Sequence, residues 1–242
     1  MNILVINPNS SEEMTRSIRA VLERVKRSDT NLEVVRTEGA PPAIQSAADA
    51  ALATPHVLKL VREANKHGVD AIVLACFSDP GLEPARELSD VLVLGIQETT
   101  LHIAATLGHK YTILTPLAKR IASKEQDVRR FKAEPACASV RALGMTVPET
   151  EADPKRTKER ILAVARDAIE KDGAEVLVLG CAGMVGYAAD VEDELGIVVL
   201  DPTSVAFKTA EALADLNVRH CKRGLYAPPP DVESGRETAF PT

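Results

Sequence analysis

The fold is decided by the stretch Val69-Asp70-Ala71-Ile72-Val73-Leu74-Ala75-Cys76-Phe77-Ser78-Asp79-Pro80-Gly81, in which a short apolar run ends at a cysteine and a polar, turn-forming segment follows. The same pattern occurs a second time in Ala174-Glu175-Val176-Leu177-Val178-Leu179-Gly180-Cys181-Ala182-Gly183-Met184. Short apolar runs bounded by such turn signals are typical of buried strands. We therefore predict two strands, each of which places its cysteine where the backbone leaves the sheet.

The two stretches occupy equivalent places in an internal repeat. The first strand, over residues 3–6, ends at Asn7-Pro8, much as a later strand over 111–114 ends at Thr115-Pro116. The spacing from Pro8 to Cys76 nearly equals the spacing from Pro116 to Cys181. Each half is predicted to run strand, helix, strand, helix, strand with cysteine, helix, strand, helix, because apolar residues recur at helical spacing between the strands.

This order predicts an α/β protein with two similar lobes, each a parallel β-sheet flanked by helices, related by a pseudo-twofold axis. Ligands bind beyond the carboxyl ends of the strands in such sheets. Asn9, Cys76, Thr115 and Cys181 all follow predicted strands, so we expect them to face one cleft between the lobes, which would hold the active site.

The lobes are expected to exchange helices. Helices over 99–107 and 203–216 are predicted to cross between them, which places residues 1–98 and 205–221 in the N-terminal lobe and residues 99–204 in the C-terminal lobe. Residues 222–242 are polar and rich in proline and are predicted to form a flexible tail.

Several local elements can be predicted as well. An Ala-rich helix is expected over 45–53, and a second helix is expected to begin at Thr54-Pro55, since proline favours the first helical turn. Single helices are expected over 117–131 and 185–195. Segments 39–43 and 147–153 are expected to be loops that line part of the pocket.

Composition excludes several other classes. The chain has 242 residues, 45% of them hydrophobic but only 3% aromatic, which is typical of buried parallel strands built from aliphatic residues. A net charge of -6 does not favour binding to nucleic acid or to an anionic membrane surface. No apolar run is long enough to span a membrane, and the first residues do not resemble a signal peptide. Four cysteines without an export signal indicate reduced thiols and a cytoplasmic location.

Two thiols on opposite sides of a cleft suit one kind of chemistry. A thiolate takes a proton from a carbon next to a carbonyl, and the facing thiol returns a proton to the opposite face, which inverts a stereocentre without a cofactor. Helix N-termini beside both cysteines are expected to lower their pKa. Backbone N–H groups of Ser78, Asp79, Ala182 and Gly183 are candidates for holding the enolate oxygen.

Less specific interpretations stand beside this one. A free cysteine often behaves as a small core hydrophobe, and the same pair would serve a disulfide redox sensor. A zinc site fits less well, because zinc prefers about four clustered ligands and no histidine stands near either cysteine. Asn9 and Ser10 suit a turn and a helix cap, Asp79 suits an N-cap, and Glu98 suits a solvated carboxylate.

The motifs resemble those of a known family. Asn7-Pro8-Asn9-Ser10, the segment from Cys76 to Leu82, and Leu179-Gly180-Cys181-Ala182-Gly183-Met184 are similar to the hydantoin/allantoin racemase branch of the Asp/Glu racemase superfamily. The resemblance runs over residues 1–216. It implies a cofactor-independent racemase (an isomerase) of 5-substituted hydantoins or allantoin, assembled as a homo-oligomer, with Cys76 and Cys181 as the catalytic pair. The substrate-binding residues would be Asn9, Ser10, Ser78, Asp79, Thr115, Ala182 and Gly183, and no metal or cofactor is implied.

Some positions depart from the family pattern. Ser10 stands where the family usually has Thr, Ser78 where it usually has Gly, and Glu98-Thr99 where it often has Glu-Ala. The Asp-Ser-Gly and Cys-Thr-His segments of glutamate racemases are absent. Arylmalonate decarboxylases keep one cysteine of the pair, whereas this chain keeps both. These two differences favour racemisation of a substrate other than an amino acid, and other members of the superfamily (amino-acid racemases, isomerases and decarboxylases) are the alternative.

Overall fold

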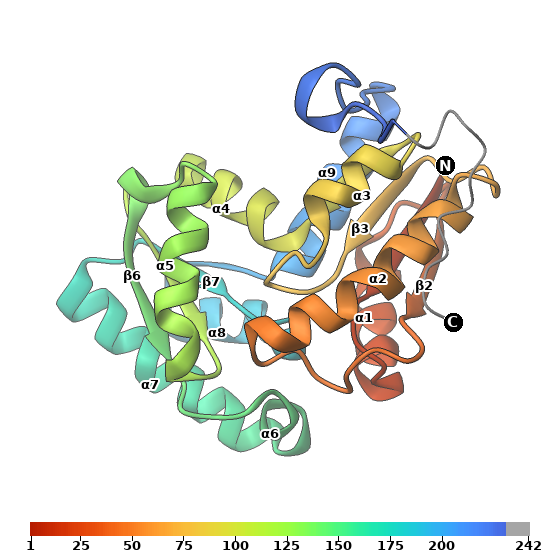
Figure 1. The fold of residues 1–242 in the computed structure, drawn as a ribbon. Helices are drawn as coiled ribbons and strands as arrows, with labels where there is room; N and C mark the ends of the chain where they lie inside the picture. Colours follow the sequence, from red (N-terminus) through yellow and green to blue (C-terminus); the bar gives the residue numbers. More distant parts are fainter. Residues whose placement is uncertain (231–242) are drawn as a thin grey trace.

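Two parallel four-stranded sheets form the framework of the computed structural model, which describes residues 1–230 (Figure 1). The first sheet has the order β2 (Asn31–Arg36), β1 (Asn2–Asn7), β3 (Ala71–Leu74), β4 (Leu92–Gly95). The second has the order β6 (Cys137–Ala142), β5 (Tyr111–Thr115), β7 (Val176–Leu179), β8 (Val198–Leu200). The strand order is the same in both, so the predicted fold of two similar α/β lobes is confirmed.

The register places the ends of the central strands level with one another. In the first sheet Ile6 of β1 pairs with Leu74 of β3, and in the second Leu114 of β5 pairs with Leu179 of β7. All four residues are fully buried, as expected for strands covered on both faces. The segments that follow these pairs leave the sheets at equivalent places and carry the cysteines.

Helices flank both sheets. Those of the first half are α1 (Glu12–Val25), α2 (Ala47–Ala64), α3 (Leu82–Leu88) and α4 (Ile96–Leu107). Those of the second half are α5 (Ile121–Arg130), α6 (Val147–Ala152), α7 (Pro154–Asp172), α8 (Ala188–Leu195) and α9 (Pro202–Asp215). Short 3₁₀ turns span Ala118–Arg120, Glu134–Ala136, Ala182–Met184 and Gly224–Tyr226.

Helices α4 and α9 join the two halves. The chain leaves β4 through α4, which packs against β7 and β8 of the other sheet. After β8, the chain returns through α9, which packs against β1, β3 and β4. The two helices also pack against each other, between the sheets (Figure 1). This arrangement agrees with helices that cross between lobes, while the lobe bounds 1–98 plus 205–221 and 99–204 stay a prediction.

The prediction of two helices between β2 and β3 is wrong. Helix α2 runs without a break through Pro55, and its N-cap is Ser46, whose hydroxyl accepts from the Asp49 N–H at 3.1 Å. The Thr54 hydroxyl donates to the Ala50 carbonyl at 2.9 Å, so it bonds within the helix and caps no new one. Burial of Val57 and Val61 along one face stabilises the continuous helix against the loss of one backbone hydrogen bond at proline.

The expected loop at 147–153 is also wrong. It contains helix α6, which begins with a capping box in which Thr146 and Glu149 exchange hydrogen bonds. The helix is short and largely polar, so its apolar pattern is too brief to predict it. The helix expected over 117–131 is a 3₁₀ turn followed by α5, and the helix expected over 185–195 begins only at Ala188.

Residues after α9 lie against α3. The Tyr226 hydroxyl accepts from Arg86 at 3.2 Å, and the Lys222 ammonium donates to the Arg86 carbonyl at 2.5 Å. The remainder of the predicted flexible tail, residues 231–242, lies outside the described residues. Within residues 1–230, every helix is too short or too polar to cross a membrane.

Candidate active site

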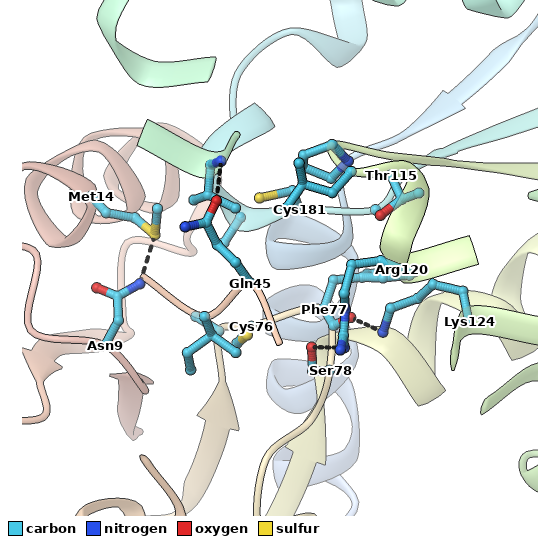
Figure 2. A pocket seen from close by; sticks show the side chains of 17 residues that line it. Asn9, Met14, Gln45, Cys76, Phe77, Ser78, Thr115, Arg120, Lys124 and Cys181 are labelled. Atoms are coloured by element: carbon cyan, nitrogen blue, oxygen red, sulfur yellow. Dashed lines mark hydrogen bonds between the residues drawn. The ribbon is translucent and has the colours of Figure 1, made fainter. Parts of the chain in front are cut away.

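A pocket lies between the two halves, at the carboxyl ends of their sheets (Figure 2). Its walls come from the segments after β1, β3, β5 and β7, together with residues before α2 and at the starts of α1, α5 and α6. It is lined by Asn9, Met14, Ile44, Gln45, Ala75, Cys76, Phe77, Ser78, Thr115, Pro116, Leu117, Arg120, Lys124, Val147, Gly180, Cys181 and Ala182. Six of the nine predicted site residues, including both cysteines, are therefore brought together.

Cys76 stands where β3 leaves the first sheet. The last ladder bond of this strand runs from the Ala75 N–H to the Ile6 carbonyl at 2.8 Å. The Cys76 carbonyl then accepts from the Ser78 and Asp79 N–H groups at 2.8 and 2.9 Å, which closes a tight turn. The chain therefore turns directly after the cysteine, and its side chain lines the pocket.

Asp79 is a helix cap and does not line the pocket. Its carboxylate accepts from the Gln97 and Glu98 N–H groups at 3.0 and 2.8 Å, at the start of α4. Burial raises the pKa of Asp79 to about 7, although both N–H groups lower it. A Cβ at Gly95 would lie 2.3 Å from its Cγ, so only glycine fits there. The carboxylate thus ties the turn after Cys76 to α4.

Cys181 follows the last ladder hydrogen bond of β7 in the second sheet, as Cys76 follows that of β3 in the first. The Gly180 N–H donates to the Leu114 carbonyl at 2.7 Å, and a Cβ on Gly180 would lie only 2.7 Å from that oxygen. Glycine therefore permits the close approach to β5. The Cys181 Sγ accepts from the Gly183 N–H at 3.3 Å, at the start of the 3₁₀ turn.

Burial dominates the electrostatics of both thiols. It raises the pKa of Cys181 to about 12, with further increases from Cys76 and Glu151 and a decrease from the Gly183 N–H. Burial also raises the pKa of Cys76, while the Lys124 charge opposes this most strongly. The prediction that helix N-termini lower both pKa values is wrong, because loss of water around the thiols outweighs the nearby N–H groups.

Two cations in the pocket were not found from the sequence. Lys124 of α5 is 2% exposed, donates to Gln97 Oε1 at 2.9 Å and to the Phe77 carbonyl, and forms an ion pair with Asp127 at 3.0 Å. Arg120 donates to the Ser78 hydroxyl at 3.1 Å. Their spacing of four residues puts both on one helical face. Other charged residues fill the same segment, however, so spacing alone does not reveal which ones point inward.

The remaining predicted residues divide into two groups. Asn9 is buried and lines the pocket, but its Oδ1 also accepts from Asn7 Nδ2 and the Ser11 N–H, which organises the turn after β1. Thr115 also lines the pocket. Ser10 and Gly183 do not line it, and the cap of α1 is Ser11.

Most of the predicted oxyanion donors are already used within the protein. The N–H groups of Ser78 and Asp79 bind the Cys76 carbonyl, and the N–H of Gly183 binds the Cys181 sulfur. Ala182, the fourth predicted donor, lines the pocket. All four cysteines are free thiols, and residues 1–230 hold no group of three His, Cys, Asp or Glu side chains suited to a metal ion.

Comparison with known proteins agrees with this geometry. The model of the Asp/Glu/Hydantoin racemase family matches residues 3–210. The chain belongs to this family. As a family member, the protein is an isomerase of the racemase type.

Its relatives cover nearly the whole chain. A hydantoin racemase of Paenarthrobacter aurescens is 35% identical over 234 residues, which is 96% of this racemase and 99% of the relative. A hydantoin racemase of Rhizobium meliloti is 35% identical over 229 residues, 95% of each chain. The structure of an allantoin racemase from Klebsiella pneumoniae is 33% identical with a TM-score of 0.92, and covers 95% of this racemase and 94% of that chain.

Proposed function

We propose that this racemase inverts C5 of 5-substituted hydantoins or of allantoin, with Cys76 and Cys181 as the two acid–base groups. The observation that carries the proposal is that two free thiols, at the ends of equivalent strands in the two sheets, line a single pocket. The names of the relatives, hydantoin racemase and allantoin racemase, supply the substrate class. We also expect a homo-oligomer in the cytoplasm, as the resemblance and the cysteine content imply.

The proposed reaction needs only the two thiols. One cysteine, as thiolate, takes the C5 proton, and the electron pair of the C–H bond moves into the ring to form an enolate at the C4 carbonyl. The other cysteine, as thiol, gives its proton to the opposite face of C5, and the enolate returns to the carbonyl. The first cysteine is then the thiol and the second the thiolate, so the enzyme is ready for the reverse direction.

The charges near the two sulfurs differ, and this assigns their resting states. At Cys76 the charge of Lys124 favours a thiolate more strongly than Asp79 disfavours it. At Cys181 Glu151 disfavours a thiolate more strongly than Lys124 favours it. The pair shares one proton between two sites, so its titration belongs to both residues together. In this proposal Cys76 is the thiolate and Cys181 the thiol before substrate binds, and the Thr115 hydroxyl and the Ala182 N–H hold the enolate oxygen.

A racemisation assay tests the proposal. Each enantiomer of a 5-alkylhydantoin and of allantoin is followed by optical rotation, with the native enzyme and with Cys76→Ser and Cys181→Ser. Because loss of one acid–base group costs about 10² to 10⁴ in rate, each variant is expected to lose at least about a hundredfold in activity. Cys221→Ser, at an exposed cysteine outside the pocket lining, is the matched control. Native-like activity in either pocket variant, or no racemisation of either substrate class by the native enzyme, would contradict the proposal.

A further inference from the structure

The charged side chains that line the pocket are all cationic. Among residues 1–230, Arg120 and Lys124 are the charged members of the lining, and no carboxylate stands beside them there. The pocket lining therefore carries two positive charges and no negative one. Whether either charge is available to a ligand depends on what each cation binds within the protein.

Lys124 is balanced within the protein. Its ammonium pairs with Asp127 at 3.0 Å and also binds Gln97 Oε1 and the Phe77 carbonyl. An ammonium has three donors, so these contacts use its full capacity. Lys124 therefore supports the turn beside Cys76 and has no donor left for a ligand.

Arg120 is not balanced in this way. Within the described chain it forms no ion pair, and its guanidinium makes one hydrogen bond, from Nη2 to the Ser78 Oγ at 3.1 Å. The side chain is half-buried, and the charge of Lys124 lies close enough to interact with it unfavourably. A guanidinium is a cation with five hydrogen-bond donors. Most of its hydrogen-bonding capacity is therefore free at the pocket wall.

Ser78 determines where that guanidinium is held. The hydroxyl belongs to the turn directly after Cys76, so the hydrogen bond draws Arg120 from the second half of the chain towards this thiol (Figure 2). A fixed planar guanidinium with unused N–H groups binds a carboxylate through two parallel hydrogen bonds. The partner that this arrangement lacks is an anion carried by the ligand.

We propose that Arg120, positioned by Ser78, binds a carboxylate on the 5-substituent of the substrate, so that the enzyme prefers hydantoins with a short acidic side chain, such as hydantoin-5-acetic acid. This inference rests on the proposed function, since it assumes that C5 lies between the two thiols. The substituent leaves C5 beside the Cys76 turn, where Ser78 holds the guanidinium. A neutral substituent would leave the half-buried Arg120 without its counter-charge.

Two ligands of nearly equal shape test the inference. Hydantoin-5-acetic acid and its amide differ in charge but hardly in size. The native enzyme is expected to favour the acid by about tenfold or more in kcat/KM, as for a hydrogen-bonded charge pair. In Arg120→Met this preference should fall to near unity, and in Ser78→Ala it should fall by about threefold because the guanidinium loses its anchor. Lys119→Met, which removes an exposed cation one residue away and outside the lining, should retain the native preference.

Equilibrium binding of both ligands separates this inference from the proposed reaction. If neither ligand is racemised but the acid binds more tightly, and Arg120→Met abolishes that difference, the proposed function fails and the anion site stands. Equal binding of acid and amide by the native enzyme would overturn the inference. A parallel loss of activity on both ligands in Arg120→Met would also overturn it, because that result would show a guanidinium acting on the ring enolate.

Discussion

At the scale of single residues, Lys124 is the charge that most favours a thiolate at Cys76, one of the two proposed acid–base groups. Burial disfavours thiolates, and the cation beside Cys76 is the strongest opposing influence on its pKa. An opposite charge within about 4–6 Å shifts a pKa by about 1–3 units. The buried ammonium therefore favours the thiolate form of Cys76, although burial keeps the pKa of this thiol above its ordinary value.

Replacement of that ammonium should change the pH dependence. In Lys124→Met the pKa of Cys76 rises, so the thiolate fraction at a given pH falls. The acidic limb of the kcat/KM profile is expected to move to higher pH by about one unit or more. Near neutral pH, kcat/KM of Lys124→Met should then fall about tenfold for each unit by which the pKa rises. At alkaline pH, where Cys76 is a thiolate in both proteins, kcat/KM of the variant should approach the native value.

The profile is compared with that of Lys119→Met, which removes an exposed positive charge nearby. Thiolate absorbance is measured during the same titration, and thermal unfolding shows whether the variant is folded. An acidic limb that stays at its native position in folded Lys124→Met would contradict the assignment of Cys76 as the resting thiolate.

The sequence pattern predicted the residues at the strand ends of the pocket but not its two cations. Cys76, Cys181, Asn9 and Thr115 follow buried strands, and strand ends meet at one edge of a parallel sheet, so their meeting in one pocket could be predicted. Arg120 and Lys124 lie in a segment with many charged residues, where helical periodicity does not distinguish an inward cation from a solvated one. Their role depends on contacts with the other half of the chain.

At the scale of elements, the link between Asp79 and α4 holds the Cys76 turn. Asp79 has a φ of 43°, a strained value for a residue other than glycine, and its carboxylate takes two N–H groups of the helix. Gly95 leaves the space that the carboxylate fills. Strand β4, helix α4 and the turn after Cys76 are thus joined through one buried side chain.

This link predicts a specific pattern of stability losses. Asp79→Ala removes the cap and should lower the free energy of unfolding by about 1–2 kcal/mol. Gly95→Ala should cost a similar amount, because the new methyl group displaces the same carboxylate. In the double variant the losses should not add, since the second change has no carboxylate left to displace.

Urea unfolding of the two single variants and the double variant measures this pattern. Asp90→Ala, at an exposed aspartate two residues before β4, serves as the control and should be nearly neutral. Additive losses at Asp79 and Gly95 would show that they stabilise the protein independently.

Element boundaries were harder to predict than the order of elements. The buried face of α2 continues past Pro55, so tertiary packing overrides a local signal that usually starts a helix. Helix α6 is too short for its periodicity to be recognised, yet its first residue lines the pocket. Distant segments decide the course of α2, whereas α6 begins at a local capping box, Thr146 to Glu149, whose spacing is visible in the sequence.

At the scale of the whole molecule, two equivalent sheets place one thiol each at a shared pocket. The repeat could be predicted because each half carries its own complete pattern of strands, turns and cysteine. Contacts between the halves, such as Arg120 with Ser78, could not, since each partner is ordinary within its own half. Helices α4 and α9, which pack against each other and against the sheets, therefore fix how the two thiols face the pocket.

The most direct test of the two-thiol account is deuterium incorporation at C5, measured by mass spectrometry and NMR in D₂O from each pure enantiomer of a 5-alkylhydantoin. With the native enzyme, deuterium should appear in the newly formed enantiomer well before it appears in the remaining substrate. Cys181→Ser and Cys76→Ser should both fail to racemise, while a variant that keeps one thiolate exchanges the proton of one enantiomer only. Early and equal labelling of both enantiomers by the native enzyme, or native-like racemisation by either variant, would contradict the account.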